Sequence, residues 1–597
     1  MTRSSSCAAI AAALLVAAAP APASAALHDS LEQLAQEVVY GSAALRPMLA
    51  TALGIAGHDA ELESPGEAER AAYLGHLQQW EQQLHALSAR ITPATAQTDR
   101  DDARLLAAQL TAQLNALQVY QTDRKDYGAA ANAIVNATFI QFQHLPVPGQ
   151  DGATAADLAR GWADLISRLS KAPAYIAAAQ RLVTAPCHLY GSIALQQLGG
   201  APDFMNGALT DAARAQLGAH SAAWSRFVAA RDGALAAIAA TRAYIDAHAP
   251  TWPENYAMGR EAYDRMLRDE QLLPFNADDI ERMGRDELAH GWAEEAWLTS
   301  LARQRGVAFG APSGGGLAPG GEAVIGYYRD RIDELTRFMV DHDVVTIPAW
   351  LGTMAVVETP SFLQPVSPGA SMNPPRLFSA ASTGYYYITP PRSLEEAAAR
   401  LDMNEDFDRD RILSTAAHEA MPGHFLQLSI ARRHPDFIRR IQDSPAFEEG
   451  WAFYGEEMFV RLGLYGDHLD GPLFTARWER VRGARAIVDP KLATGEWSYD
   501  QAVDFYAAQS GFTRTAAAAA VAGIATQPGY FIAYTVGRWQ IETLYSDYIM
   551  KMGARGSLHD FHDRLLCYGS TPLAVVGPDL LADLDRSTAE VRAAAHY

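Results

Sequence analysis

The strongest constraint on the fold is a helical pattern that covers almost all of the first half of the chain. From Leu27 to about His248, apolar residues recur three or four positions apart, and Leu, Ala, Gln and Arg dominate the composition. Loops that contain proline interrupt the pattern. The sequence therefore predicts a mainly α protein in which residues 26–250 form an N-terminal helical half.

The remaining residues, 251–597, are also predicted to be mostly helical, with a small β region at about 344–390. The runs Val344–Pro348 and Met354–Val357 have the composition of strands, and the aromatic run Gly384–Thr389 follows them. We expect this half to carry the catalytic residues. With the N-terminal half it should form one large helical body with a deep cleft.

The charge balance argues against one class of partner. The chain has a net charge of −21 and no basic block, whereas a protein that binds nucleic acid normally presents a basic surface. We therefore expect no nucleic-acid partner and attribute the acidity to solubility.

The N-terminus has the features of a secretory signal peptide. Arg3 precedes an alanine-rich apolar run from Cys7 to about Ala19, and Ala-Ser-Ala at 23–25 offers a cleavage site with small residues. The run is too short and too interrupted by proline for stable membrane insertion, and Cys7 lacks the flanking residues of a lipoprotein site. We predict that residues 1–25 are removed and that the protein is exported, periplasmic or secreted. The alternative is a disordered, alanine-rich start.

Two cysteines, Cys187 and Cys567, remain after the predicted cleavage. Export permits a disulfide, and an even number of cysteines is compatible with one. Two buried thiols are the alternative, and the sequence does not favour either.

The chemistry is predicted to centre on the segment 416–424, which reads Ala-Ala-His-Glu-Ala-Met-Pro-Gly-His. Two neutral imidazoles and a carboxylate bind zinc and leave a position open for water, and a further glutamate can take that water's proton. We predict His418, His424 and the downstream Glu449 as the ligands of one divalent ion, zinc. Glu419 would then be the general base.

The six-residue spacing of the histidines is unusual, because the common zinc-peptidase helix carries them four apart. In an undisturbed helix from about Asp408 to Arg433, His424 would point roughly 120° away from His418. The ring of Pro422 must kink or bulge the helix, and a two-residue bulge would return both histidines to one side. The alternative is that His418 packs in a core helix and His424 is incidental.

A second helix, predicted over Phe447–Leu462, supplies the carboxylates. Glu449 and Glu456 lie seven residues apart and share one face of this helix. Glu449 can therefore face a metal while Glu456 supports a histidine ligand from behind, and Glu448 should point elsewhere. Taken alone, an acidic pair at a helix start is explained by compensation of the helix dipole.

Three tyrosines and one arginine are candidates for substrate contact. Tyr530, Tyr534 and Arg538 stand four residues apart in a predicted aromatic helix, Pro528–Met552. The Tyr534 hydroxyl can stabilise an oxyanion, Arg538 can bind a substrate carboxylate, and Tyr530 would line the site. In the aromatic strand, Tyr386 would lie where the strand pairs with an extended peptide. The alternatives are a packed helix with a solvated arginine and a core strand without a ligand role.

Three segments together resemble one known family. They read HEAMPGHFLQ at 418–427, EEGWAFYGEEM at 448–458 and QPGYFIAYTVGR at 527–538. In this order they are similar to the motifs of the bacterial family called domain of unknown function 885, as are the run VETPSFLQPVSPGASMNPP and the strand GYYYITPP. The resemblance implies a mostly helical, zinc-metallopeptidase-like protein. Its style is that of the gluzincins, such as angiotensin-converting enzyme and the thimet-type oligopeptidases.

Matched residue by residue, the resemblance implies the same metal ligands and the same base, and it places Tyr534 near the transition state. It also implies a histidine in the stretch 488–497, where this chain has Ala493. If that histidine assists catalysis, this protein would differ in rate or substrate, or would be inactive.

These features predict an exported zinc-dependent peptidase that hydrolyses short peptides or chain ends through a metal-activated water. Two alternatives stay open. One is a metal-dependent amidohydrolase or esterase that acts on a small amide or another non-peptide substrate. The other is a non-catalytic periplasmic binding protein with a vestigial metal site, which the histidine spacing and Ala493 favour and the complete ligand set disfavours. The sequence predicts no particular oligomeric state.

Overall fold

The computed structural model describes residues 23–149, 152–307, 322–360, 370–389 and 409–597. Residues 1–22 of the predicted signal peptide lie outside this part of the chain, and the predicted cleavage point falls at the start of the first helix. Within the described residues, no helix is both long enough and apolar enough to cross a bilayer.

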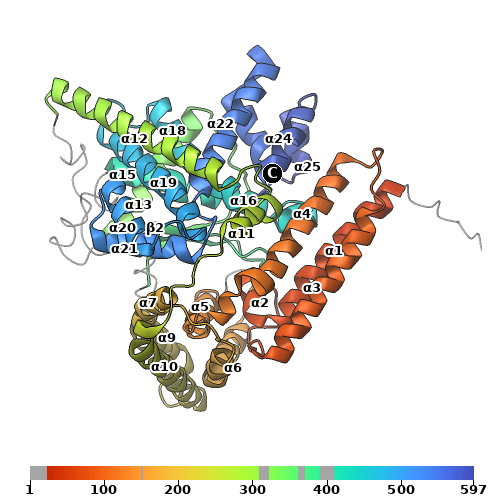
Figure 1. Cartoon of the computed structure of the whole chain (residues 1–597), viewed down its shortest axis with the longest axis vertical. Helices are drawn as coiled ribbons and strands as arrows, with labels where there is room; N and C mark the ends of the chain where they lie inside the picture. The colour runs from red at the N-terminus through yellow and green to blue at the C-terminus, as the bar shows by residue number, and fades with distance from the viewer. Residues whose placement is uncertain (1–22, 150–151, 308–321, 361–369, 390–408) are drawn as a thin grey trace, which may run out of the picture.

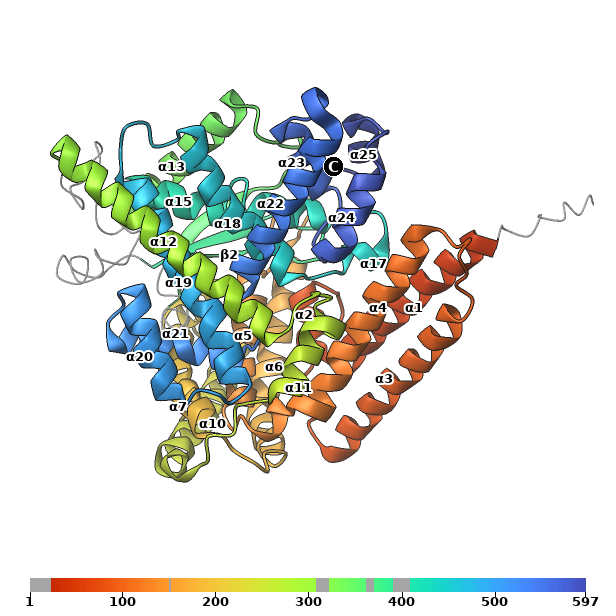
Figure 2. The ribbon, with the colours of Figure 1, turned by 45° about the horizontal axis from the view of Figure 1, so that its top comes forward.

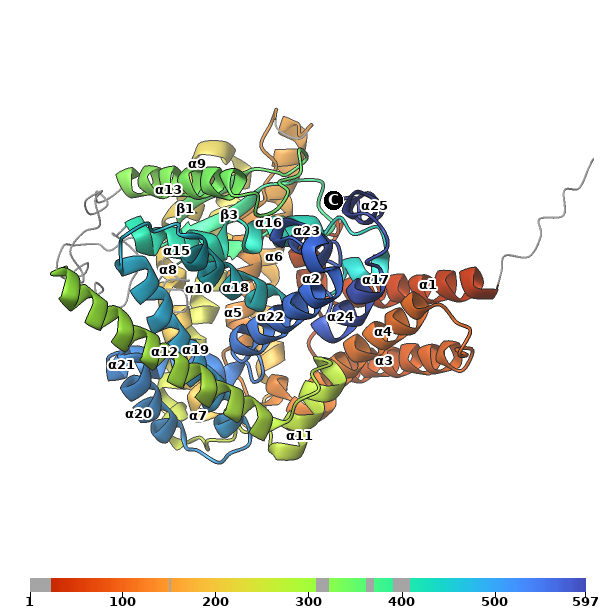
Figure 3. The same ribbon diagram turned by 90° about the horizontal axis from the view of Figure 1, so that it is seen from above.

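The protein is mainly α, as the sequence predicts. Its first helices pack side by side and form an arm at one side of the molecule (Figures 1 and 3). Their apolar stripes face one another, and Leu31, Leu77 and Leu106 are completely buried between them. The arm consists of α1 (Ala23–Leu45), α3 (Glu67–Ser88) and α4 (Gln97–Asn115), and the short helix α2 (Pro47–Leu53) follows α1 outside it.

A second helical group completes the N-terminal half around a core that contains Trp162 and Phe227. At the start of α6, the side chains of Thr154 and Asp157 each accept a hydrogen bond from the other residue's backbone N–H group, which fixes where the helix begins. The group consists of α5 (Ala129–Gln143), α6 (Ala155–Gln180), α7 (His188–Gln197), α8 (Ala201–Asn206), α9 (Ala208–Leu217) and α10 (Ala222–His248).

The second half is built from longer helices, among which α12 and α19 lie side by side (Figure 2). Gly291 makes this close packing possible, because a Cβ atom there would lie 2.8 Å from the backbone nitrogen of Arg480. The helices are α11 (Arg260–Arg265), α12 (Ala277–Arg305), α13 (Glu322–Asp341), α15 (Arg409–Glu419), α16 (His424–Ala431), α17 (Phe437–Arg440), α18 (Pro445–Leu462), α19 (Asp470–Ala493), α20 (Tyr499–Ser510), α21 (Arg514–Thr526), α22 (Ala533–Met552), α23 (Leu558–Leu566), α24 (Leu573–Ala582) and α25 (Thr588–Ala594).

The predicted small β region is present as a three-stranded sheet in the order β1-β3-β2. Strand β1 (Met354–Glu358) runs parallel to β3 (Gly384–Ile388), and β2 (Ala370–Asn373) runs antiparallel to β3 at the edge of the sheet. Helix α13 packs on β1, while α15 and α16 pack on β2. The sheet therefore lies directly against the helices that carry the two histidines.

The prediction of a strand at Val344–Pro348 is wrong. Side chains from the C-terminal region take up the backbone groups that a neighbouring strand would need. Asp563 accepts the Thr346 N–H at 2.9 Å, the Tyr597 hydroxyl donates to the Thr346 carbonyl at 2.7 Å, and His562 contacts the Val344 carbonyl at 2.8 Å. The segment is irregular because these bonds satisfy its backbone without a sheet.

The hydrophobic core crosses the predicted boundary near residue 250. Phe437 of α17 is buried among the leucines of α1 and α4, and Tyr387 of β3 is buried with Trp162 of α6. The division of the chain into two halves stays a prediction. Cys187 and Cys567 are both buried thiols and form no disulfide with each other.

Helices α18 and α22 cross so closely that only glycine fits at the contact. A Cβ atom at Gly537 would lie 1.8 Å from the Ala446 carbonyl oxygen, and one at Gly450 would lie 2.4 Å from the carbonyl carbon of Gly537. The crossing places Glu449 of α18 close to Tyr534 of α22, because each is within three residues of a contact glycine.

We predict that Gly537→Ala lowers the free energy of unfolding by about 1–3 kcal/mol, because the added methyl group forces the two helices apart. Thermal unfolding measures the effect. The matched control is Gly75→Ala, since Gly75 is exposed in α3 and a Cβ atom there meets nothing within 4 Å. That substitution should leave stability unchanged or raise it slightly. Equal stability of the two variants would contradict the role of the crossing.

Candidate metal centre

The two histidines lie on different helices that meet end to end. We expected one helix with a bulge, but α15 ends at Glu419 and α16 begins at His424. Pro422 cannot continue the first helix, and the Trp451 indole donates a hydrogen bond of 2.8 Å to its carbonyl oxygen. The connection is thus a fixed turn. Like the bulge that we expected, it places both histidines on the same side.

Gly423 makes this turn possible. A Cβ atom at this position would lie 1.8 Å from the His418 carbonyl oxygen and 2.5 Å from that of Ala417. Any other residue would push α16 away from the end of α15. Because His424 follows directly, the close approach brings its side chain back towards His418, and the two imidazole rings lie 4.8 Å apart, nearly perpendicular to each other.

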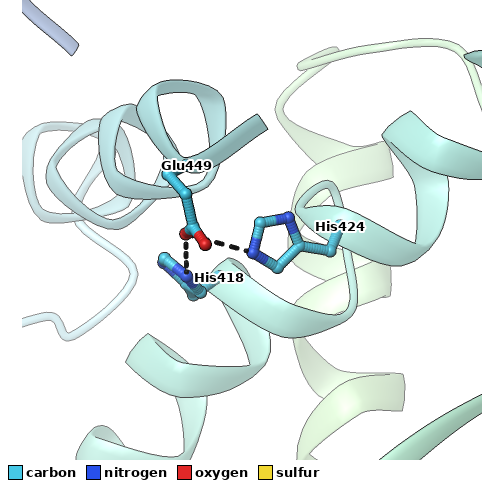
Figure 4. A group of neighbouring side chains, drawn as sticks. All are labelled: His418, His424 and Glu449. Carbon is cyan, nitrogen blue, oxygen red and sulfur yellow. Dashed lines mark ion pairs between the residues drawn. The ribbon is translucent and has the colours of Figure 1, made fainter. Parts of the chain in front are cut away.

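Glu449 completes a group of three ligand atoms (Figure 4). One of its oxygens, Oε2, lies 3.3 Å from Nε2 of His418 and 3.4 Å from Nε2 of His424. Two ligands that surround a tetrahedral zinc ion at about 2.0–2.1 Å lie about 3.3–3.5 Å from each other. Both distances from Glu449 Oε2 therefore fit one ion, and all three ligand atoms lie within 4.8 Å of one another.

The chemistry of the carboxylate also fits a cation. Glu449 is buried, and its Oε2 atom faces the two imidazole nitrogens without a well-formed hydrogen bond to either of them or to another described residue. A buried carboxylate oxygen without a hydrogen bond is costly unless a cation or proton neutralises its charge. Burial acts to raise the pKa of Glu449, but the two imidazoles outweigh it and hold that pKa well below its usual range.

A second layer of side chains orients His418. The Glu456 carboxylate lies 2.7 Å from His418 Nδ1 and receives two hydrogen bonds from Arg482, at 2.6 and 2.9 Å. Burial alone would lower the pKa of His418, but the carboxylates of Glu449 and Glu456 raise it to about 10. The same negative charge that favours a proton here would stabilise a divalent ion, and the Nδ1 contact leaves Nε2 free to bind it.

Glu419 lies beside the ligand group and lines the same cavity. Burial raises the pKa of its carboxyl group, and the neighbouring histidines partly oppose that rise. A carboxylate with a raised pKa accepts a proton more readily than an ordinary surface glutamate. Glu448 also lines the cavity, although we expected it to point elsewhere.

Two of the predicted tyrosines reach the site. The ring of Tyr534 stacks against His418, with the ring centres 6.0 Å apart. Burial, and then the charge of Glu449, raise the pKa of Tyr534 well above its usual range, so its hydroxyl stays protonated and can donate. Tyr530 lies in the turn before α22 and donates a hydrogen bond to Oε1 of Glu449. It therefore fixes the carboxylate from the side that does not face the histidines.

Two other predicted residues do not line the cavity. Arg538 is buried in ion pairs with Glu287 and Glu457, and Tyr386 is completely buried in the core against Tyr328. We expected both to contact substrate, and their positions correct that expectation. Arg538 lies one turn beyond Tyr534 along α22, where the helix has already left the cavity, and Tyr386 lies on the central strand instead of the edge strand.

The site opens into a cavity of about 1600 Å³. Both predicted halves of the chain line it, from Val38 in α1 to Ser570 near the C-terminus, and so does the edge strand β2. Ala493 lies outside this lining and is buried against α11 and α12. The position where the resemblance implies a histidine is therefore not part of the cavity wall.

Sequence reasoning missed two arginines of α19. Arg482 holds Glu456 in place, and Arg485 lines the cavity. The sequence predicts the helix but not which face turns to the site, because α19 is buried on nearly all sides. Their spacing of three residues, with Trp478 one turn earlier, was the available signal.

We predict that Gly423→Ala weakens zinc binding by at least about tenfold, the size of effect that follows the loss of support for a metal ligand. Calorimetric titration of the metal-free protein measures it. Gly455→Ala is the matched control, because its Cβ atom would meet only the Ala417 carbonyl oxygen at 3.8 Å. Unchanged affinity in the Gly423 variant would contradict the proposed need for close approach.

Comparison with known proteins gives a family and a fold. A family model described as "Bacterial protein of unknown function (DUF885)" matches residues 47–578, and no curated protein matches. One similar solved structure is described as "a putative lipoprotein of unknown function" from Shewanella oneidensis. It has 20% identity and a TM-score of 0.71, and the match covers 92% of this chain and 99% of that one.

A second similar structure is described as "the putative lipoprotein from Colwellia psychrerythraea". It has 18% identity and a TM-score of 0.74, and the match covers 94% of this chain and 99% of that one. At this identity the likeness shows a shared fold alone, so the metallopeptidase character stays a proposal. Since the family model spans most of the sequence, the chain belongs to the bacterial family of unknown function DUF885.

Proposed function

We propose that this protein is a metal-dependent hydrolase that cleaves short peptides or chain ends. The observation that carries the proposal is the convergence of His418 Nε2, His424 Nε2 and Glu449 Oε2 on the wall of a large cavity. Two imidazoles and one carboxylate are the ligand set of catalytic zinc sites that keep a position open.

The residues of the site would divide the chemical work. A divalent ion held by the three ligands would lower the pKa of a water molecule and polarise a carbonyl group. Glu419 would accept the proton of the attacking water and return it to the leaving amine. Tyr534, which stays protonated, would donate a hydrogen bond to the oxyanion as it forms.

The size and lining of the cavity favour a peptide. Pockets for small molecules usually measure about 300–1000 Å³, whereas this cavity measures about 1600 Å³. Residues 370–373 of the edge strand β2 line it, and an edge strand can pair with an extended peptide through main-chain hydrogen bonds. The strand expected for this role was β3, which is central and already paired on both sides.

We further infer that the protein is exported. The sequence of residues 1–25 has the pattern of a signal peptide, and both similar structures are described as lipoproteins, which are exported proteins. We propose a periplasmic or secreted location for this chain, as the signal-peptide pattern of residues 1–25 predicts.

We predict that Glu419→Gln retains about one equivalent of zinc but loses peptide hydrolysis by about 10²–10⁴-fold, the usual contribution of a general base. Elemental analysis and a fluorogenic peptide assay measure the two quantities. Glu448→Gln, which removes a neighbouring carboxylate of the same cavity, should keep its activity close to that of the wild type. Hydrolysis by the Glu419 variant at the wild-type rate would exclude the mechanism, and a wild-type protein that holds no metal would favour a binding protein.

A series of substrates separates a peptidase from an amidase or esterase. We predict that kcat/KM rises from a blocked single-residue amide to tripeptides and tetrapeptides, because the longer chains occupy more of the cavity and can pair with β2. Folded proteins should not be cleaved, since the site lies inside the cavity. Equal kcat/KM for the single-residue amide and the tetrapeptide would favour the small-amide alternative.

A further inference from the structure

Arg485 of α19 lines the same cavity as the candidate metal centre, and aromatic rings surround it. The carbon atom of its guanidinium group lies 5.5 Å from the ring centre of Trp478, 5.3 Å from that of Phe531 and 5.2 Å from that of Tyr534. Rings at these distances hold a guanidinium group in one place by cation–π attraction without neutralising its charge.

The neighbouring arginines of α19 and α22 each pair with a carboxylate. Arg482 pairs with Glu456, Arg480 with Glu295 and Arg538 with Glu287. No carboxylate of the described residues lies within the 4.0 Å ion-pair distance of Arg485, whose charge interacts with the hydroxyl groups of Tyr506 and Tyr534 and with the carboxylate of Glu449. A partly buried cation without a counterion is costly, so an anion that enters the cavity would bind it favourably.

Arginines are enriched in the cavity wall relative to the whole protein, which has a net charge of −21. Five arginines line the cavity, and none of them forms an ion pair within the described part of the chain; they are Arg46, Arg376, Arg432, Arg440 and Arg485. Four carboxyl groups line it as well, those of Glu419, Asp443, Glu448 and Glu449. The wall therefore carries both signs of charge, and an anion is favoured beside the arginines.

We propose that Arg485 binds the C-terminal carboxylate of the peptide substrate, so that the enzyme removes residues from the carboxyl end. The proposal rests on the proposed function. The Tyr534 ring links the two places, because it lies 5.2 Å from the Arg485 guanidinium and 6.0 Å from the His418 ring. With about 3.3–3.6 Å per extended residue, the released fragment is one to about three residues long.

In this geometry the substrate enters with its carboxyl end towards α19. The C–N bond of one peptide group breaks. The attacking water supplies the hydroxyl group of the new carboxyl end, and its proton goes to the amine of the released fragment. Arg485 acts as a specificity residue, since it contacts the substrate terminus and not the bond that breaks.

Binding tests the assignment without relying on turnover. The Glu419→Gln variant, loaded with zinc, is titrated calorimetrically with an acetylated tripeptide as its free acid and as its C-terminal amide. The free acid should bind about 10- to 100-fold more tightly, the range expected for a charge-assisted bidentate contact. Adding Arg485→Gln to this variant should abolish the preference, because it weakens the binding of the free acid and not that of the amide. Arg485→Lys should keep part of the preference. Arg477→Gln, on α19 outside the cavity, should leave it intact.

Other outcomes overturn the assignment. If Arg485→Gln weakens the acid and the amide equally, the arginine has a structural role only. If the Glu419→Gln variant binds the free-acid and the amidated tripeptide equally tightly, no group in the cavity recognises the C-terminal carboxylate. If an amidated peptide with an acidic side chain binds as tightly as the free acid, the recognised anion is the side chain. A preference that depends on Arg485 in a wild-type protein that hydrolyses no peptide would support this inference and refute the proposed function.

Discussion

The site depends on one contact between backbone atoms, the approach of Gly423 to the carbonyl oxygen of His418. No side chain fits between them, since a Cβ atom would lie 1.8 Å from the oxygen. The contact lets α16 begin directly over the end of α15, and it brings together two histidines whose spacing would point them apart on one helix. The glycines at the crossing of α18 and α22 act in the same way, because they let Glu449 and Tyr534 approach the histidines from two further helices.

Electrostatics then favours a cation at the proposed metal site. Glu449 and Glu456 place two buried carboxylates around His418, while Arg482 neutralises only the second of them. The charge that remains unbalanced lies at the three converging ligand atoms. Arg485, whose guanidinium lies 5.2 Å from the Tyr534 ring centre, carries the reverse imbalance, a guanidinium without a paired carboxylate. The proposed cation site and the proposed anion site, both next to this one aromatic ring, would suit a substrate that presents a carbonyl group and a carboxylate a few residues apart.

The sequence predicted those parts of the structure that depend on residue type and regular spacing. Helical periodicity gave the fold class, and the motif residues His418, His424, Glu449 and Glu456 do come together. Prediction from the sequence failed where contacts between distant parts of the chain determine the local structure. The segment at 344–348 is strand-like in composition, but side chains of the C-terminal region bind its backbone. The sequence could not show that Arg485 lines the cavity and Arg538 does not, because this depends on which face of each helix points to the cavity.

The most direct test of the account is a crystal structure of the zinc-loaded protein with anomalous diffraction data collected at the zinc absorption edge. The account predicts one strong anomalous peak about 2.0–2.2 Å from His418 Nε2, His424 Nε2 and a Glu449 oxygen. A zinc-loaded crystal with no peak between these three residues, and with Glu449 still in contact with both histidines, would contradict it.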